Sequence, residues 1–282
     1  MVCLLDSPPE TEWMQQVAAE MNATETAFVW REFNEVRLRW FTPVTEVNLC
    51  GHATLAAAHA LREENWLRDS LTVRFQTRSG VLVAEYEAAG IRLEFPLIPV
   101  ALADPVPGLA EALGVPVPTV YTAGEDLLVP LPSRAAVETL QPDPARIAEI
   151  PVRGVIVTAR GDATIDFVSR FFAPRIGIPE DPVTGSAHCA LAAYWSGPGG
   201  LRQRDFVGWQ ASKRGGRVRV RIRGDKVHLL GTAVTVAAGE LLVLSAPPAE
   251  PFEPTARREG PSAPARVRAM RPTLRPRQNP PQ

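Results

Sequence analysis

Two segments of the chain place small polar residues where an alanine-rich helix is expected to begin. The first, residues 45–61, reads "TEVNLCGHATLAAAHAL", and the second, residues 180–195, reads "EDPVTGSAHCALAAYW". The backbone N–H groups at such a helix start bind carboxylates or phosphates and stabilise a developing oxyanion. Glycine at Gly51 and Gly185 would let the backbone approach a ligand closely. If the two segments face each other, they form a pocket for an anion.

The polar side chains beside these glycines are candidates for proton transfer, and each also has a structural interpretation. Ser186 and Asp181 could simply cap the second helix, a common role of serine and aspartate. His52 could be a buried histidine with satisfied hydrogen bonds. Glu25, in "NATETAFV", is in isolation most simply a surface carboxylate.

The remaining histidines and cysteines point to structural roles. His59 and His188 lie inside the expected helices. Cys50 and Cys189 are of a type more often found as small core residues than as nucleophiles. No HExxH motif is present and the four histidines are spread over the chain, so no metal site is expected. No GxGxxG motif follows a predicted strand, which disfavours a nicotinamide or flavin fold.

The two segments belong to a longer internal repeat. Each copy opens with an arginine, two aromatic residues and a proline, in "RWFTP" at 39–43 and "RFFAP" at 170–174. Each copy then carries an acid, Glu46 in the first and Asp181 in the second, and ends in the alanine-rich helix. This repeat predicts two homologous α/β halves, each with a central apolar helix wrapped by strands.

Apolar periodicity places the elements that would position these residues. A buried strand at 2–5 is followed by an amphipathic helix at 10–22. The other predicted strands lie near 26–30, 36–41, 71–76, 80–87, 90–95, 119–123, 126–131, 154–159, 164–170, 217–223, 226–231 and 240–244. The other predicted helices lie near 133–140, 144–149 and 186–195.

A proline-rich stretch near residue 100 predicts the boundary between the halves. We expect an N-terminal half over 1–97 and a C-terminal half over 98–245. Residues 246–282 are dense in proline and arginine and lack a periodic apolar face, which predicts a disordered tail.

Composition excludes several classes of function. The chain has 282 residues, 45% hydrophobic and 22% charged, with a formal net charge of -1, so nothing in its charge points to nucleic acid or to a membrane surface. Its three cysteines are far apart, which argues against a disulfide framework and favours a reducing, cytoplasmic compartment. No run of about 18 apolar residues is present to span a membrane.

Five motifs in order closely resemble the PhzF family of phenazine-biosynthesis-like isomerases, over roughly residues 1–244. They are "EMNATETAFV", "RWFTPVTEVNLCGHATLAAAHAL", "FQTRSGVL", "EDPVTGSAHCALAAYW" and "WQASKRGGRV". The resemblance implies the diaminopimelate-epimerase fold of class α/β (α+β). In that fold two pseudo-symmetric halves each curve a mixed sheet around a central helix, and the active site lies in the cleft between them.

The resemblance also assigns roles. Glu25, in Thr24-Glu25-Thr26, would be the catalytic acid and base, with His52, Asp181 and Ser186 as supporting catalytic residues. The backbone around Gly51 and Gly185-Ser186 would bind the substrate carboxylate. The implied activity is a cofactor-independent isomerisation of a small carboxylate by a possible homodimer, with no metal, nucleic acid or membrane partner.

Two alternatives remain open. The related racemases use two thiols, of which Cys50 matches the first, whereas no thiol exists near Thr184-Gly185. The second alternative is a non-catalytic binding protein. It is motivated by the tail and by the start of the chain at Met1-Val2-Cys3, where family members usually carry an earlier strand with a Gly-Asn-Pro motif.

Overall fold

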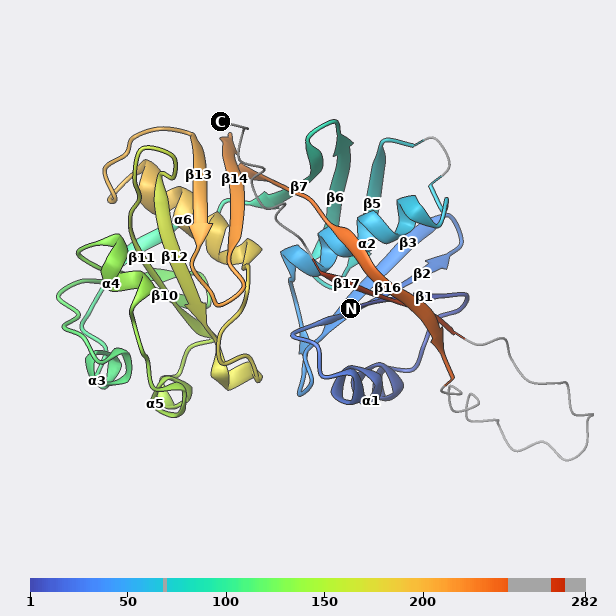
Figure 1. The fold of residues 1–282 in the computed structure, drawn as a ribbon, viewed down its shortest axis with the longest axis horizontal. Helices are drawn as coiled ribbons and strands as arrows, with labels where there is room; N and C mark the ends of the chain where they lie inside the picture. Colours follow the sequence, from blue (N-terminus) through green and yellow to red (C-terminus); the bar gives the residue numbers. More distant parts are fainter. Residues whose placement is uncertain (68–69, 243–264, 272–282) are drawn as a thin grey trace, which may run out of the picture.

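The computed structural model describes residues 1–67 and 70–242, together with the backbone of residues 265–271. The chain forms two lobes that lie side by side, each with a sheet around a central helix (Figure 1). This architecture confirms the predicted fold class.

The N-terminal half holds its sheet between α1 on one side and the buried helix α2 on the other. Helix α1 packs Trp13, Met14 and Val17 against the sheet. Its elements are β1 (Val2–Leu5), α1 (Thr11–Met21), β2 (Thr26–Glu32), β3 (Glu35–Phe41), β4 (Glu46–Val47), α2 (Gly51–Glu63), β5 (Thr72–Thr77), β6 (Gly80–Glu87) and β7 (Gly90–Pro96).

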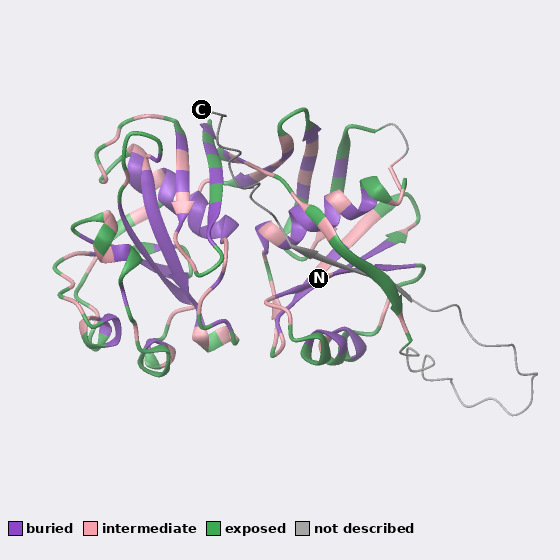
Figure 2. Cartoon of the chain, viewed as in Figure 1, coloured by how far each residue is buried: buried purple, intermediate pink, exposed green. Residues whose placement is uncertain are grey.

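The C-terminal half repeats this plan around helix α6, which buries ten of its twelve residues. Figure 2 shows α6 and the strands beside it as the most continuously buried part of this half. Its elements are β8 (Val100–Ala103), α3 (Leu109–Leu113), β9 (Val120–Ala123), β10 (Asp126–Pro130), α4 (Arg134–Glu138), α5 (Pro144–Glu149), β11 (Gly154–Arg160), β12 (Phe167–Phe172), the 3-10 turn η1 (Pro174–Ile176), α6 (Gly185–Ser196), β13 (Asp205–Gln210), β14 (Gly216–Arg223) and β15 (Lys226–Gly231).

Strand pairing shows the internal repeat directly. In the N-terminal half β1 pairs parallel with β2, β2 antiparallel with β3, and β3 parallel with β5. In the C-terminal half β10 pairs parallel with β11, β11 antiparallel with β12, and β12 parallel with β13. The two halves therefore have the same topology, as the sequence repeat predicted.

The chain crosses between the halves twice. Strand β7 pairs antiparallel with β15 at the seam. After β7 the chain enters the C-terminal half, where β8 and β9 pair beside β10. After β15 it returns, and β16 (Val234–Leu241) pairs with β17 (Ala265–Arg271), which pairs with β1. Strands β16 and β17 thus lie with the N-terminal half, so the predicted C-terminal half of 98–245 is too long by β16.

The tail prediction is wrong for one segment. Residues 265–271 were expected to be disordered but form β17, because their backbone pairs with both β1 and β16. The rest of the predicted tail, apart from β17, lies outside the described residues.

Candidate active site

The first residues of the two central helices touch each other. A Cβ built on Gly51 would lie 2.9 Å from the Cα of Gly185, and a Cβ on Gly185 would lie 2.9 Å from the Cα of Gly51. We expected these glycines to let the backbone approach a ligand. The structure gives a different reason, since any side chain here would force α2 and α6 apart.

Both helices begin without a side-chain cap. The N-cap residues are Cys50 for α2 and Thr184 for α6, and neither side chain accepts a hydrogen bond from its helix. Among the described residues, no hydrogen bond uses the N–H groups of Gly51-His52 or Gly185-Ser186. The proposed capping role of Ser186 and Asp181 is therefore not observed. Two partly positive helix ends converge, and their first N–H groups make no hydrogen bond to a described residue.

Each helix start is held by an arginine–glutamate pair. Arg39 on β3 bonds Glu46 with Nε–Oε1 and Nη2–Oε2 distances of 2.7 and 2.8 Å. Arg170 on β12 bonds Glu180 with the corresponding distances of 2.7 and 3.0 Å. The counterpart of Glu46 is therefore Glu180, and matching Glu46 with Asp181 in the sequence repeat was wrong by one residue.

Glu25 lies in the site rather than on the surface. It immediately precedes β2 and is only 6% exposed. Its Oε2 lies 2.9 Å from Nε2 of His52 in an ion-pair contact but accepts no hydrogen bond from a described residue, and no described residue bonds Oε1 either. One carboxylate oxygen thus contacts the histidine and the other is free for a ligand.

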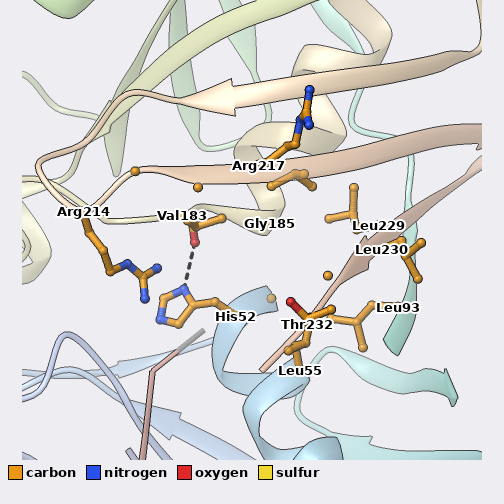
Figure 3. Close-up of a pocket in the computed structure, with 15 residues that line it drawn as sticks. His52, Leu55, Leu93, Val183, Gly185, Arg214, Arg217, Leu229, Leu230 and Thr232 are labelled. Carbon is orange, nitrogen blue, oxygen red and sulfur yellow. Dashed lines mark hydrogen bonds between the residues drawn. The ribbon is translucent and has the colours of Figure 1, made fainter. Parts of the chain in front are cut away.

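The hydrogen bonds of His52 determine where its protons are. Nδ1 lies 2.9 Å from the backbone carbonyl of Val183, which can only accept, so Nδ1 carries a proton (Figure 3). Nε2 faces the Glu25 carboxyl, and two unprotonated acceptors at 2.9 Å would repel each other. The Glu25–His52 pair therefore retains one proton between its two side chains.

The surroundings place that proton on the histidine. Burial alone would lower the pKa of His52, but the nearby Cys50, Glu25 and Asp181 outweigh it and raise the pKa well above its ordinary value. These groups act at short range, with Asp181 Oδ1 lying 3.8 Å from Nδ1. The raised pKa favours a charged imidazole beside Glu25.

Asp181 belongs to a buried polar network at the start of α6. Its Oδ2 accepts a 2.6 Å hydrogen bond from the hydroxyl of Thr184, and Oδ1 has no hydrogen bond to a described residue. Gln210 of β13 donates to the Asp181 carbonyl and accepts from the Thr184 N–H. Burial raises the pKa of Asp181. The orphaned oxygen makes Asp181 a possible second proton acceptor.

Ser186 is tied to an arginine that our reading of the sequence missed. Nη2 of Arg153 donates a 3.0 Å hydrogen bond to the Ser186 hydroxyl, and the same guanidinium pairs with Asp126. Nη1 makes no hydrogen bond to a described residue. No motif marks Arg153 in "IPVRGVIV"; the available signal was its position just before a buried strand, which it shares with Glu25.

Cys50 lies at the site but is a poor base near neutral pH. Its Sγ lies 3.7 Å from His52 Nε2, and with Glu25 the three side chains could surround a metal ion. Burial raises the pKa of Cys50 to about 11, which keeps the thiol neutral near neutral pH. The direct contact of Glu25 with His52 also favours a proton between them over an ion.

These side chains from both halves surround one small cavity of about 20 Å³. Its lining brings together every predicted site residue, which are Glu25, Gly51, His52, Asp181, Gly185 and Ser186, and adds Cys50 and Arg153. His59 and His188 lie elsewhere, as expected. His188 is fully buried, its Nδ1 bonds the Thr184 carbonyl, and burial lowers its pKa to about 4.

Comparison with known proteins shows the family of the chain. The sequence profile of the PhzC-PhzF family, described as phenazine biosynthesis-like protein, matches residues 1–239. The chain belongs to this family. An uncharacterized isomerase of Halalkalibacterium halodurans is 43% identical, in a match covering 86% of this chain and 91% of the relative. Phenazine biosynthesis-like domain-containing protein 1 of Mus musculus is 42% identical, covering 85% and 92%.

Solved structures show the same fold. A PhzF-family phenazine biosynthesis protein of Enterococcus faecalis superposes with a TM-score of 0.78 at 37% identity, covering 86% of this chain and 92% of that one. A probable proline racemase of Agrobacterium radiobacter K84 superposes with a TM-score of 0.53 at 12% identity, covering 78% and 79%, which shows a shared fold alone. No helix in the described residues is long and apolar enough to cross a membrane.

Proposed function

We propose that this protein is a cofactor-independent isomerase that moves a proton on a small unsaturated or carbonyl-conjugated carboxylate, with Glu25 as the general acid and base. The observation that carries the proposal is the buried Glu25–His52 pair. It places a carboxylate oxygen that no described residue binds and an imidazole with a raised pKa in one cavity. Family relatives named isomerases support the same class of reaction.

In the proposed reaction Glu25 first removes a proton from a carbon next to the conjugated system. The C–H electron pair becomes an enolate, whose negative charge the free N–H groups at the starts of α2 and α6 stabilise. Protonated Glu25 then returns the proton to another carbon on the same face. His52, Asp181 and Ser186 polarise the substrate or relay a second proton.

The substrate carboxylate would bind at the C-terminal half. Ser186 stands in the first turn of α6, and Arg153 holds its hydroxyl while keeping Nη1 unpaired. A charge-assisted hydrogen bond from Nη1 and the helix N–H groups suit a carboxylate. Asp126 keeps the guanidinium in place from behind, since its carboxylate bonds Nε at 2.8 Å and pairs with Nη2.

A two-thiol racemase is the less favoured reading. Cys50 and Thr184 occupy equivalent N-cap positions, so the second thiol is replaced by a hydroxyl. The raised pKa of Cys50 further removes it as a base near neutral pH.

Deuterium exchange tests the proposal. Wild type, Glu25→Gln and Cys50→Ala would be incubated in D2O with small carboxylates including dihydro-hydroxyanthranilate, diaminopimelate and proline, and followed by NMR. We expect deuterium uptake that Glu25→Gln abolishes and Cys50→Ala retains. Uptake that persists in folded Glu25→Gln protein would refute the assignment of the base. Glu25-independent ligand binding without exchange would instead indicate a binding protein.

A further inference from the structure

The two carboxyl oxygens of Asp181 have different surroundings. Oδ2 accepts a 2.6 Å hydrogen bond from the Thr184 hydroxyl. Oδ1 accepts no hydrogen bond from a described residue and lies 3.8 Å from Nδ1 of His52. Asp181 is only 4% exposed and lines the active-site cavity. Buried polar atoms are nearly always hydrogen-bonded, and one explanation for an exception is a catalytic role.

Gln210 determines the direction of the hydrogen bond to Oδ2. Its Oε1 lies 2.8 Å from the N–H of Thr184, which can only donate, and its Nε2 lies 2.7 Å from the carbonyl of Asp181, which can only accept. These two contacts fix the orientation of the amide. Nε2 therefore donates its second hydrogen to the Thr184 hydroxyl oxygen, 3.1 Å away. The hydroxyl hydrogen is left to donate to Oδ2 of Asp181.

This arrangement leaves one oxygen of Asp181 open to a proton. A proton on Oδ2 would have to displace the hydroxyl hydrogen of Thr184, which donates to no other group among the described residues. A proton on Oδ1 would displace no hydrogen bond, because that oxygen has none there. The carboxyl group is therefore one-sided, with Oδ2 held by the fold and Oδ1 available to the site.

The N-terminal half folds without such a network. By the equivalent pairs that β12 makes with β13 and β3 makes with β5, Gln210 of β13 corresponds to Thr77 of β5. The Thr77 hydroxyl instead donates to the Gly80 carbonyl, and no hydrogen bond in the described part of the chain joins it to Cys50 at the start of α2. The shared topology thus does not require this contact, which points to a role of Gln210 in the site.

We propose that Thr184 and Gln210 are positioning residues that reserve Oδ1 of Asp181 for proton exchange with the substrate. The inference rests on the proposed function, in which Asp181 takes part in a second proton transfer. Thr184 occupies Oδ2, and Gln210 keeps the Thr184 hydroxyl directed at it. When Oδ1 takes a proton, the electron pair of the broken bond stays on the substrate, and the same oxygen later returns the proton.

The groups around Asp181 act on its charge in opposite directions. Burial has the largest effect and raises the pKa of Asp181; the charge of His52 and the Thr184 hydrogen bond act against it, while the charge of Glu25 acts with it. Arg153 lines the same cavity and brings a positive charge. Removing the Thr184 hydroxyl takes away a hydrogen bond that favours the carboxylate, so the pKa of Asp181 should rise further.

A titration of Asp181 tests the geometry without any substrate. The carboxyl carbon would be followed by NMR against pH in the full chain as wild type, Thr184→Val and Thr184→Ser. We expect Thr184→Val, which keeps the shape of the side chain, to raise the midpoint by about one pH unit, and Thr184→Ser to restore it. Thr158→Val is the control, because it removes a buried hydroxyl that bonds Trp195 in the same half, and it should leave the midpoint unchanged.

Deuterium exchange connects the titration to the reaction, with dihydro-hydroxyanthranilate, diaminopimelate and proline as probes. Thr184→Val and Gln210→Met should each lower kcat about tenfold with little change in KM, a smaller loss than removal of a general acid or base causes. Thr184→Ser should keep a rate near that of wild type. If Gln210→Met does not fold, because it leaves the Thr184 N–H and the Asp181 carbonyl unpaired, the two Thr184 variants carry the test.

Three outcomes would overturn the proposal. One is an unchanged Asp181 midpoint in folded Thr184→Val protein. Another is an equal shift in Thr184→Val and Thr158→Val. The third is a shifted midpoint with an unchanged rate of exchange, which would mean that Oδ1 does not take part. Failure of the proposed function is distinguishable, because wild-type protein would then exchange no proton although the Asp181 midpoint still responds to Thr184→Val.

Discussion

The two halves of this protein have the same topology but contribute different chemistry to the cavity between them. Arg39–Glu46 and Arg170–Glu180 fix the two helix starts in the same way. At the first turn the N-terminal half then has His52 where the C-terminal half has Ser186. The repeated scaffold therefore delivers a titrating group from one side and a neutral hydroxyl from the other.

The residues ahead of β2 and β11 extend this contrast. Thr26 pairs with Phe41 and Val155 with Phe172, so Glu25 corresponds to Gly154, and Arg153 stands one residue earlier. The N-terminal half places a carboxylate at this point, and the C-terminal half places a guanidinium. We infer that the N-terminal half moves the proton while the C-terminal half holds the substrate's negative charge.

Removing the carboxylate should have the largest effect. Glu25→Gln is expected to lower kcat by about 10²–10⁴-fold, the usual contribution of a positioned general base. Substrate affinity should change little, because the residues proposed to bind the substrate carboxylate lie in the C-terminal half. Equilibrium binding and turnover would be measured on the same protein, with exposed Glu12→Gln as the control. A change mainly in KM would contradict the inference that the N-terminal half moves the proton and the C-terminal half holds the substrate's negative charge.

Removing the guanidinium of Arg153 should act mainly on KM rather than on kcat. Arg153→Met is expected to raise KM by about 10–100-fold with a smaller change in kcat, since charge-assisted hydrogen bonds contribute about 1.5–3 kcal/mol. The change also leaves Asp126 buried without its partner, which destabilises the fold. Arg153→Met combined with Asp126→Asn is therefore the informative variant: stability should recover and KM should not.

The contact between the helix starts can be broken by one methyl group. Gly51→Ala places a Cβ 2.9 Å from Gly185 and should lower the free energy of unfolding by about 1–3 kcal/mol, as overpacking does. Gly239→Ala is the matched control, because a Cβ there meets no atom within 4 Å. Thermal unfolding of both variants tests this, and equal stability would mean that the helices do not need their close contact.

The contribution of the Arg39–Glu46 pair to stability should depend on pH. Burial raises the pKa of Glu46, but the hydrogen bonds and charges of Arg39 and Arg78 outweigh it and lower the pKa overall. A lowered pKa in the folded state gives stability that is present above the unfolded pKa and lost as pH falls through the folded pKa. Glu46→Gln should therefore cost about 1 kcal/mol near about pH 7 and less near about pH 3. Urea unfolding at both values measures this.

Much of the fold could be predicted because the repeat and the apolar periodicity are local in sequence. Strand β13 was missed because of its inward residues Phe206, Gly208 and Gln210, only one of which is a large apolar side chain. Gly208 leaves space for the ring of Phe167, and Gln210 donates a hydrogen bond to the Asp181 carbonyl. Strand β17 was missed because only pairing with β1 and β16 reveals it.

Site residues that lie in sequence motifs could be predicted, whereas residues that join the site only through a tertiary contact could not. Gly51, His52, Gly185 and Ser186 stand at helix starts and could be found from the repeat. Glu25 gave no sign of its role by itself and was identified only by resemblance. Arg153 belongs to the site through Asp126 and Ser186, which lie 27 and 33 residues away in the chain.

The pKa of His52 is the most direct test of the central claim that Glu25 and His52 hold one proton in the site. It would be measured by NMR titration of the imidazole in wild type and Glu25→Gln. The account predicts a wild-type pKa clearly above the ordinary value of about 6.5, and a fall in Glu25→Gln, where burial acts without the opposing charge. A wild-type pKa at or below the ordinary value, or one unchanged by Glu25→Gln, would contradict it.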